Sequence, residues 1–159
     1  MRWSDFAAIA PQLAARGETL LTARSLALLA TLRRDGSPRV SPIEPAFASG
    51  RLLVGAMSWS QKATDLRRDP RFSLHSPVTD VQGSEGEFQL FGRAERVVDE
   101  GLLSAAPDAW WGTHPDRADV FALDVEEAVL VTWDLERSEM TVARWTASTG
   151  VRESRRRYP

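Results

Sequence analysis

The chain has 159 residues, a formal net charge of −2 and no cysteine, and 43% of its residues are hydrophobic. These values predict one soluble globular domain, and the nearly balanced charge gives no general attraction to nucleic acid. The absence of cysteine excludes disulfides, thiol nucleophiles and thiolate metal sites. The two histidines, His75 and His114, lie too far apart in sequence to suggest a zinc site. We find no apolar run of membrane-spanning length and no signal-peptide pattern, so we expect a cytoplasmic protein without a membrane partner.

The first segment is predicted to be helical, because apolar residues recur at helical spacing from Trp3 to Arg16. Ser4 is the expected N-cap and Gly17 the expected stop. Pro11 should kink or split this helix, because proline lacks the N–H that an interior helical position needs. We expect the segment to pack across one end of the core and to be purely structural.

Two strands and a tight turn are predicted next. Ser25 to Arg33 is apolar, and Asp35-Gly36 after it is a strong hairpin signal, since both turn residues must accept a positive φ. The partner strand should run from Pro38 to Phe47 and contains three prolines, which cannot donate to a ladder. We therefore expect a gap in its pairing that leaves backbone groups free for a planar ligand. The alternative is an edge strand that proline protects from aggregation.

The stretch from Leu52 to Phe72 is the most informative part of the chain. A compact apolar strand, Leu52 to Met57, is followed by the turn Ser58-Trp59-Ser60 and a helix that reaches Asp69 and is ended by Pro70. Ser60 is the expected N-cap of this helix, because its hydroxyl oxygen can accept from the free N–H groups of the first turn.

Lys62 is the only lysine of the chain and falls in that first turn. Cations usually favour the other end of a helix, where the dipole is negative. A cation beside free N–H groups is better explained if an anion binds between them. The alternative is a solvated lysine on a surface helix.

The remaining segments are mainly short strands. A change of alternation near Gly92 predicts a bulge or bend. The predicted strands are Phe72–Ser76, Glu87–Val98, Val120–Val125, Ala128–Trp133 and Met140–Trp145. Together with the earlier strands they predict an antiparallel barrel or sandwich with few helices.

Three other segments have less regular patterns. Asp99 to Ala106 is expected to be a short helix, and Thr79 to Gly86 a loop. The stretch from Pro107 to Asp119 contains Trp110, Trp111 and His114 in an irregular pattern. One of these tryptophans could enter the core while the other covers a ligand or a second subunit, or both could pack within the chain. The Arg-rich end from 146 to 159 is expected to be solvated and poorly ordered.

Three runs carry a family resemblance: LALLATLRRDGSPRVSPIEP, LLVGAMSWSQKATDLRRDPRFSL and FQLFGRAERV. Their order resembles the pyridoxamine 5'-phosphate oxidase-like, FMN-binding split β-barrel superfamily. The resemblance implies a mostly β fold, a six-stranded antiparallel split β-barrel with helices at the barrel ends. The resemblance covers about Ser25 to Val98, with a compatible strand pattern to Trp145. With the length and the residue patterns above, we expect a single domain at residues 1–145, with an N-terminal helix at 1–17, the barrel at 25–145 and an Arg-rich tail at 146–159.

The resemblance also implies a cofactor site and a homodimer with two such sites at its interface. The flavin phosphate would be held by Ser60, Gln61 and Lys62, with Arg67 as a further candidate. The ring would lie along two strands. The candidate residues on those strands are Val40, Ser41, Pro42, Ile43, Glu44, Ala56, Met57 and Ser58.

The function implied is an FMN-dependent oxidoreductase that transfers hydride or electrons to or from a small organic substrate. The flavin would supply the redox chemistry, so no catalytic residue is assigned and no metal is expected. Two alternatives remain. The same fold could use the deazaflavin coenzyme F(420), whose acidic tail would need Arg67, Arg68 and the tail arginines. The protein could also be non-catalytic and bind flavin or haem, with His75 and His114 as the available axial ligands of a haem iron.

Overall fold

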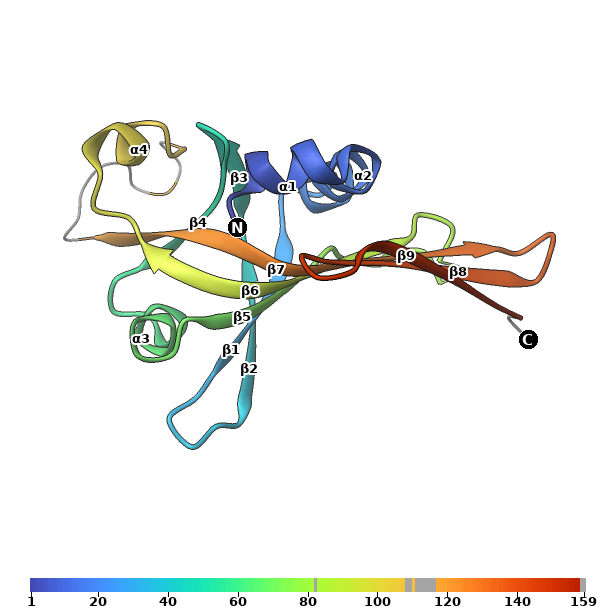
Figure 1. The fold of residues 1–159 in the computed structure, drawn as a ribbon. Helices are drawn as coiled ribbons and strands as arrows, with labels where there is room; N and C mark the ends of the chain where they lie inside the picture. Colours follow the sequence, from blue (N-terminus) through green and yellow to red (C-terminus); the bar gives the residue numbers. More distant parts are fainter. Residues whose placement is uncertain (82, 108–109, 111–116, 158–159) are drawn as a thin grey trace.

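The computed structural model describes residues 1–81, 83–107, 110 and 117–157. These residues form nine strands and four helices, and the strands join in one antiparallel sheet (Figure 1). The helices are α1 (Trp3–Ile9), α2 (Pro11–Thr22), α3 (Gln61–Arg68) and α4 (Glu100–Ser104). The strands are β1 (Ala27–Leu32), β2 (Pro38–Ile43), β3 (Pro45–Ala48), β4 (Arg51–Met57), β5 (Arg71–His75), β6 (Glu87–Arg96), β7 (Ala118–Asp134), β8 (Glu139–Thr146) and β9 (Gly150–Arg157).

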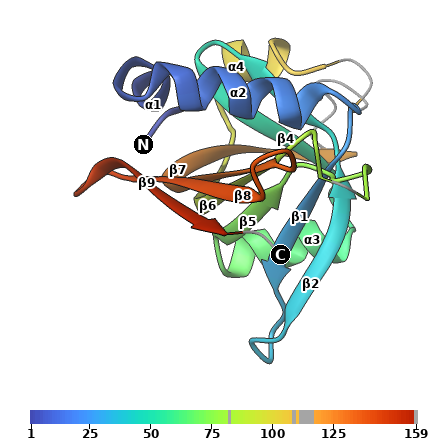
Figure 2. The same cartoon turned by 90° about the vertical axis from the view of Figure 1, so that its right-hand side faces the viewer.

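The sheet branches at β7, which is 17 residues long. Its first part pairs with β4 and its second part with β8, while β6 accompanies both parts on the other side. The main path runs β2-β1-β5-β6-β7-β4-β3 and does not close into a complete ring, and β8 and β9 extend from β7 as an arm (Figures 1 and 2). The predicted mostly β split barrel is confirmed, with nine strands in the described residues instead of six.

The proline-rich strand is divided at Glu44. β2 pairs with β1, whereas β3 pairs with β4 at the opposite end of the sheet path. Pro45 cannot donate to a ladder and restricts the residue before it to extended conformations, which favours a change of partner at this point. The single strand predicted from Pro38 to Phe47 is therefore wrong, and the break in its pairing is a transfer from one edge of the sheet to the other.

Helices α1 and α2 cover one face of the sheet, and α3 lies on the opposite side of it (Figure 1). The core beneath α1 contains aromatic contacts, with ring centroids 4.8 Å apart between Phe6 and Trp145 and 5.3 Å apart between Trp3 and Phe6. Pro11 splits the first helix as predicted and occupies the first turn of α2, where its missing N–H costs no hydrogen bond.

Two details of the N-terminal prediction are wrong. The N-cap of α1 is Arg2, and the amide of Ser4 donates to the carbonyl of Gly50 over 3.0 Å, which ties the helix to the turn before β4. Gly17 does not stop α2. The helix continues to Thr22 because the next turn buries Leu20 and Leu21, and this burial outweighs the modest helix penalty of one glycine.

The predicted bulge near Gly92 is confirmed by a register shift between Phe91 and Gly92 in the β6–β7 pairing. The extra residue is Glu126 of β7, because Phe91 pairs with Glu127 and Gly92 with Val125. A Cβ atom on Gly92 would lie 1.9 Å from the carbonyl oxygen of Asp124, so only glycine fits. The two strands predicted on either side of Glu126 are therefore one bulged strand, β7.

The C-terminal segment also differs from the prediction. Residues 150–157 form β9, which pairs with β8 along its whole length. Gly150 has a φ of 64°, and the Thr149 amide donates to the Thr146 carbonyl, so a tight turn returns the chain along β8. The segment is exposed, as expected, but it is ordered by backbone pairing that its polar composition did not indicate. Among the described helices, none has the length and apolar character needed to cross a membrane.

Candidate binding site at the start of helix α3

The site begins where β4 turns into α3. The Ser60 amide donates to the Met57 carbonyl over 2.8 Å, which closes the turn. The Ser60 hydroxyl oxygen accepts from the Ala63 amide at 3.3 Å, so the predicted N-cap is confirmed. Across the described residues, no hydrogen-bond partner is found for the amides of Gln61 and Lys62. The start of α3 therefore presents free N–H groups and the positive end of the helix dipole.

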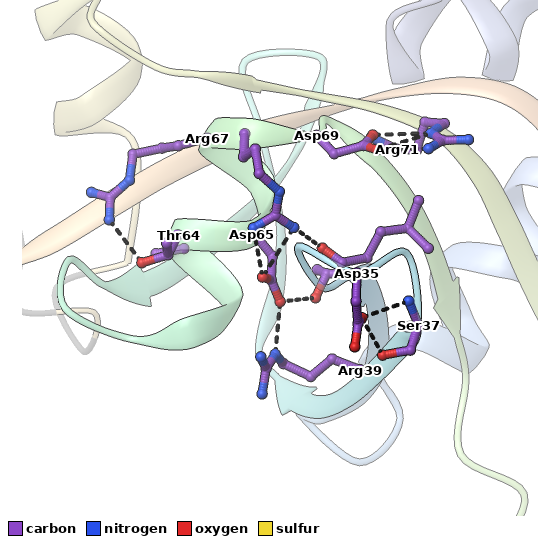
Figure 3. A network of polar contacts seen from close by, with 12 residues as sticks. Asp35, Ser37, Arg39, Thr64, Asp65, Arg67, Asp69 and Arg71 are labelled. Carbon is purple, nitrogen blue, oxygen red and sulfur yellow. Dashed lines mark hydrogen bonds and ion pairs between the residues drawn. The ribbon is translucent and has the colours of Figure 1, made fainter.

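Asp65 fixes one side of α3 to the β1–β2 hairpin. Its carboxylate is buried and accepts from Arg39 Nε at 2.7 Å and Thr31 Oγ1 at 3.0 Å (Figure 3). Arg68 adds a longer ion pair of 3.3 Å and also donates to the Leu32 carbonyl. Burial alone would raise the pKa of Asp65, but the hydrogen bonds from Arg39 and Thr31 hold this pKa below 3.8. The carboxylate is thus ionised and fully used by the protein.

Asp119 anchors the other side of α3. This buried carboxylate accepts from Arg67 Nη1 at 2.8 Å and from Arg96 Nε at 2.9 Å. Arg67 also donates to the Ser58 carbonyl over 2.9 Å, so it holds the turn before α3 in place. The sequence proposed Arg67 as a phosphate ligand, but its guanidinium is engaged with protein groups and does not line the pocket described next.

A pocket of about 330 Å³ opens beside the start of α3. We call it the α3 pocket. Its walls come from β2, the β2–β3 junction, β4, the first residue of β7 and α3. The lining residues are Leu26, Pro42, Ile43, Glu44, Gly55, Ala56, Met57, Lys62, Trp110 and Ala118. Most are apolar, with Glu44 and Lys62 as the two charged groups, a composition typical of sites for organic ligands.

Lys62 projects from α3 toward the β2 side of this pocket. Its Nζ donates to the Pro42 carbonyl over 2.6 Å. In the part of the chain that the structure describes, no carboxylate lies within 4.0 Å of this ammonium. Burial lowers the pKa of Lys62 below its usual 10.5, because desolvation disfavours the charged form. An anion bound at this point would reverse that effect.

Ser58 supplies a further group without a partner. Its hydroxyl oxygen is buried, and within the described residues it makes no hydrogen bond. A buried hydroxyl left unpaired is unfavourable by about 1–3 kcal/mol, so its presence at this turn requires an explanation. A ligand oxygen would satisfy it.

The rear wall depends on Gly55 and Trp110. The indole ring lies so close to β4 that a Cβ on Gly55 would be 2.6 Å from Trp110 Cδ2. Trp110 is only 4% exposed, and its Nε1 donates to Glu44 Oε2 over 3.1 Å. A lone glycine inside an apolar strand signals close approach of another group, so the sequence contained a clue to this contact. Trp111 and His114, the other functional candidates nearby, lie outside the described residues.

The structure brings together about half of the residues that the sequence proposed. Six line the α3 pocket: Pro42, Ile43, Glu44, Ala56, Met57 and Lys62. Ser58, Ser60 and Gln61 lie at the turn beside it. Val40 lies two residues before Pro42 on the exposed side of β2, and Ser41 is half-buried on the other side of the strand. The pocket residues missed from the sequence are Leu26, Gly55 and Ala118, whereas Trp110 was expected only to enter the core or to cover a ligand.

In the described part of the chain, no group of three potential metal ligands is found. The site instead combines a cation, free amides and a buried hydroxyl around a pocket with an apolar wall. Such a set suits an organic ligand that carries an anionic group.

Comparison with solved structures supports the fold. PhzG from Burkholderia lata superposes with a TM-score of 0.67 at 12% identity, covering 98% of this chain and 93% of PhzG. A protein related to general stress protein 26 from Clostridium acetobutylicum gives a TM-score of 0.65 at 12% identity, with coverage of 87% and 96%. A haem-binding protein from Mycobacterium smegmatis gives 0.58 at 16% identity, with coverage of 89% and 87%. At these identities the likeness concerns the fold alone.

Sequence comparison assigns the family. No curated protein matches the chain. The family model described as pyridoxamine 5'-phosphate oxidase matches residues 13–132, which include β1 to β6, α3 and most of β7. The matched region therefore contains the α3 pocket and both carboxylates that anchor α3. On this match, the chain belongs to the pyridoxamine 5'-phosphate oxidase family.

Proposed function

We propose that this protein binds FMN in the α3 pocket and acts as a flavin-dependent oxidoreductase on a small organic substrate. The observation that carries the proposal is the partly buried Lys62 ammonium, which has no carboxylate partner in the described residues and stands beside two unpaired helix amides. The bound flavin would supply the hydride or electron chemistry. The protein would bind and orient it.

The phosphate fits the start of α3. Lys62 Nζ and the amides of Gln61 and Lys62 can all donate to phosphate oxygens, and hydrogen bonds between charged groups are about twice as strong as neutral ones. The unpaired Ser58 hydroxyl offers one more donor on the same turn. The contact between Lys62 and the Pro42 carbonyl would be exchanged for one with the anion.

The ring would lie against the apolar wall of the pocket. Ile43, Ala56 and Ala118 line the pocket and are buried. The pocket volume of about 330 Å³ is near the lower end of the range for organic ligands, so one chain encloses only part of a flavin. We infer that a second copy of the chain completes the site.

The outer face of the β1–β2 hairpin supports such a homodimer. Leu28 is 44% exposed and Val40 63% exposed, and Leu28 pairs across the strands with Pro42, which lines the pocket. A contiguous exposed apolar surface beside a half-open pocket is expected at a protein interface. Val40→Glu should therefore convert a dimer to a monomer and weaken FMN binding together. A dimer that persists in this variant would place the interface elsewhere.

Deazaflavin and haem are the two alternatives to FMN, and different residues would bind each of them. Deazaflavin is favoured by the arginines of β9, since Arg152, Arg155, Arg156 and Arg157 have no carboxylate within 4.0 Å in the described residues and could bind an acidic tail. Arg67 and Arg68 are less suitable, because they already pair with Asp119 and Asp65. Haem is favoured by the likeness to the haem-binding protein. His75 is a poor axial ligand, since both its ring nitrogens have polar partners, Glu87 and Ser73.

An absorption spectrum of the purified protein, with and without added FMN, tests the proposal. We expect a two-banded flavin spectrum and quenching of FMN fluorescence on titration. Binding of the deazaflavin coenzyme alone would replace FMN with the second candidate, and a Soret band would indicate haem. Absence of binding by all three would contradict the proposed function.

A further inference from the structure

A second hollow, of about 360 Å³, adjoins the α3 pocket. It lies between the end of α2, the β2–β3 junction and the segment before β7. Its lining residues are Thr22, Ser25, Glu44, Pro45, Pro107 and Trp110. Glu44 and Trp110, which are joined by a hydrogen bond, line both cavities. We call this cavity the Glu44 hollow.

The Glu44 carboxylate has few hydrogen-bond partners among the described residues. It accepts from Trp110 Nε1, and within the described ranges no arginine, lysine or histidine lies within 4.0 Å of it. An ionised carboxylate has about four acceptor positions, and because Glu44 is exposed, most of them are open to water or to a ligand. It differs in this respect from Asp65 and Asp119, each of which accepts from two arginines.

The other side chains around the hollow offer few hydrogen-bond donors. The Thr22 hydroxyl donates to the Glu18 carbonyl at 2.8 Å, which leaves its oxygen free only to accept. Trp110 Nε1 is already committed to Glu44, and Pro45 and Pro107 have no N–H. The Ser25 hydroxyl is the one group on this wall that can either donate or accept. The hollow therefore favours a ligand that brings its own donors.

Ser25 has an unusual backbone at the rim. Its φ is +55°, a left-handed conformation that is unfavourable by about 1–3 kcal/mol for a residue other than glycine. Its amide donates to the Thr22 carbonyl at 3.1 Å, which closes the turn between α2 and β1. Ser49 and Ser138 have the same left-handed conformation at other turns, so this conformation is not by itself evidence for a ligand. Here it holds two hydroxyl-bearing residues against the hollow.

We propose that the Glu44 hollow binds the positively charged, N–H-bearing group of a small organic molecule, with the rest of that molecule directed toward the α3 pocket. An ammonium or amidinium group would donate to Glu44 and Thr22, and Trp110 with the two prolines would contact its apolar body. Binding of this cation does not depend on FMN. Its identification as the substrate end of the site rests on the proposed function.

Calorimetric titration of the flavin-free protein with three matched probes tests the proposal. The probes are benzylammonium, benzyl alcohol and benzoate, which share a ring and differ in charge. We expect benzylammonium to bind about tenfold more tightly than benzyl alcohol, and benzoate to bind most weakly. Equal affinity for all three, or no binding of benzylammonium, would overturn the proposal.

Two variants test whether benzylammonium binds in the Glu44 hollow. Glu44→Gln keeps the shape and the contact with Trp110 but removes the charge, and it should lower benzylammonium affinity about tenfold, as expected for one charged hydrogen bond. Glu136→Gln, at an exposed carboxylate with no polar partner in the described residues, is the matched control and should bind like the wild type. Thr22→Phe should narrow the hollow from the opposite wall and weaken binding independently. Unchanged affinity in both Glu44→Gln and Thr22→Phe would contradict the site.

Repeating the titration with FMN present separates the two proposals. If FMN binds and benzylammonium does not, only the Glu44 hollow is rejected. If benzylammonium binds through Glu44 and FMN does not, the cation site stands and the flavin function is rejected.

Discussion

The two parts of helix α3 differ in how their polar groups are satisfied. Toward its C-terminus, Asp65 is tied to Arg39 of β2 by a short ion pair (Figure 3). Arg67 is tied in the same way to Asp119 of β7. At its N-terminus, two amides and the Ser58 hydroxyl have no partner in the described residues, and Lys62 rests on a carbonyl. The difference lies within one helix of eight residues.

The hydrogen-bonded and the unpaired polar groups of α3 suggest different roles. Buried polar groups are nearly always hydrogen-bonded in native proteins, so a satisfied cluster indicates a role in holding the fold. An unsatisfied cluster beside a pocket is where the proposed FMN phosphate would find its partners. The anchored part of α3 holds the backbone at the start of the helix in a fixed position, so that binding of the proposed anion would require only the Lys62 side chain to exchange its contact with the Pro42 carbonyl.

The largest expected effect comes from removing the anchor. Asp65→Ala leaves Arg39 and Arg68 without their shared buried carboxylate. Breaking such a pair destabilises a protein by about 3–5 kcal/mol. Chemical denaturation should show a loss of this order. A loss below about 1 kcal/mol would mean that α3 is held by its apolar face alone.

The pH dependence of stability should follow the same carboxylate. Because the pKa of Asp65 is lowered from 3.8 in the folded protein, its contribution is fully present above pH 3.8 and is lost as the pH falls through the lowered pKa. Acid titration of wild type and Asp65→Asn should therefore give a shallower decline for the variant. Parallel curves would assign acid unfolding to other groups.

Removing the charge of Lys62 is expected to change stability less than removing Asp65, and to stabilise the flavin-free protein instead of destabilising it. Burial lowers the pKa of this ammonium, so the charged form destabilises the flavin-free protein, and stability should rise as the pH increases toward 10.5. Lys62→Met should raise the thermal midpoint of the flavin-free protein slightly. Arg34→Met, at an exposed cation in the β1–β2 turn, is the control and should leave it unchanged. A lower midpoint for Lys62→Met would show that its contact with the Pro42 carbonyl stabilises the fold.

The smallest effect is expected at Asp69 and Arg71. They form a close ion pair at 2.6 Å, and the side chain of Arg71 is 62% exposed (Figure 3). The pair lowers the pKa of Asp69 to about 2 through hydrogen bonds from Arg71. Solvent screens such pairs, so Asp69→Asn should leave the denaturation midpoint unchanged at neutral pH. A large shift would indicate that Asp69 has a further role as the residue that ends α3.

The sequence predicted the elements that local signals determine. Asp35-Gly36 indicated the hairpin, Ser60 the N-cap of α3, and Gly92 the bulge, and the structure confirms all three elements. In the hairpin turn only Gly36, and not Asp35, has the positive φ expected of both residues. Each element depends on a residue type with a narrow conformational or hydrogen-bonding role. The same kind of signal led to Lys62, because a lone lysine in the first turn of a helix conflicts with the dipole.

Long-range pairing could not be predicted in the same way. The transfer of the chain at Glu44, the continuity of β7 and the ordering of β9 depend on which strands meet, and no local pattern specifies that. The contacts of Arg67 could not be predicted for the same reason. Its partner Asp119 is 52 residues away in sequence, and only the fold brings the two side chains together.

The most direct test compares FMN with riboflavin, which lacks the phosphate, in wild type and in Lys62→Met. Fluorescence titration of the four combinations isolates the coupling between the phosphate and the Lys62 ammonium. We predict that the wild type prefers FMN by at least about tenfold and that Lys62→Met loses this preference while keeping its affinity for riboflavin. The same FMN-to-riboflavin ratio in both proteins would contradict the assignment of the start of α3 as the phosphate site.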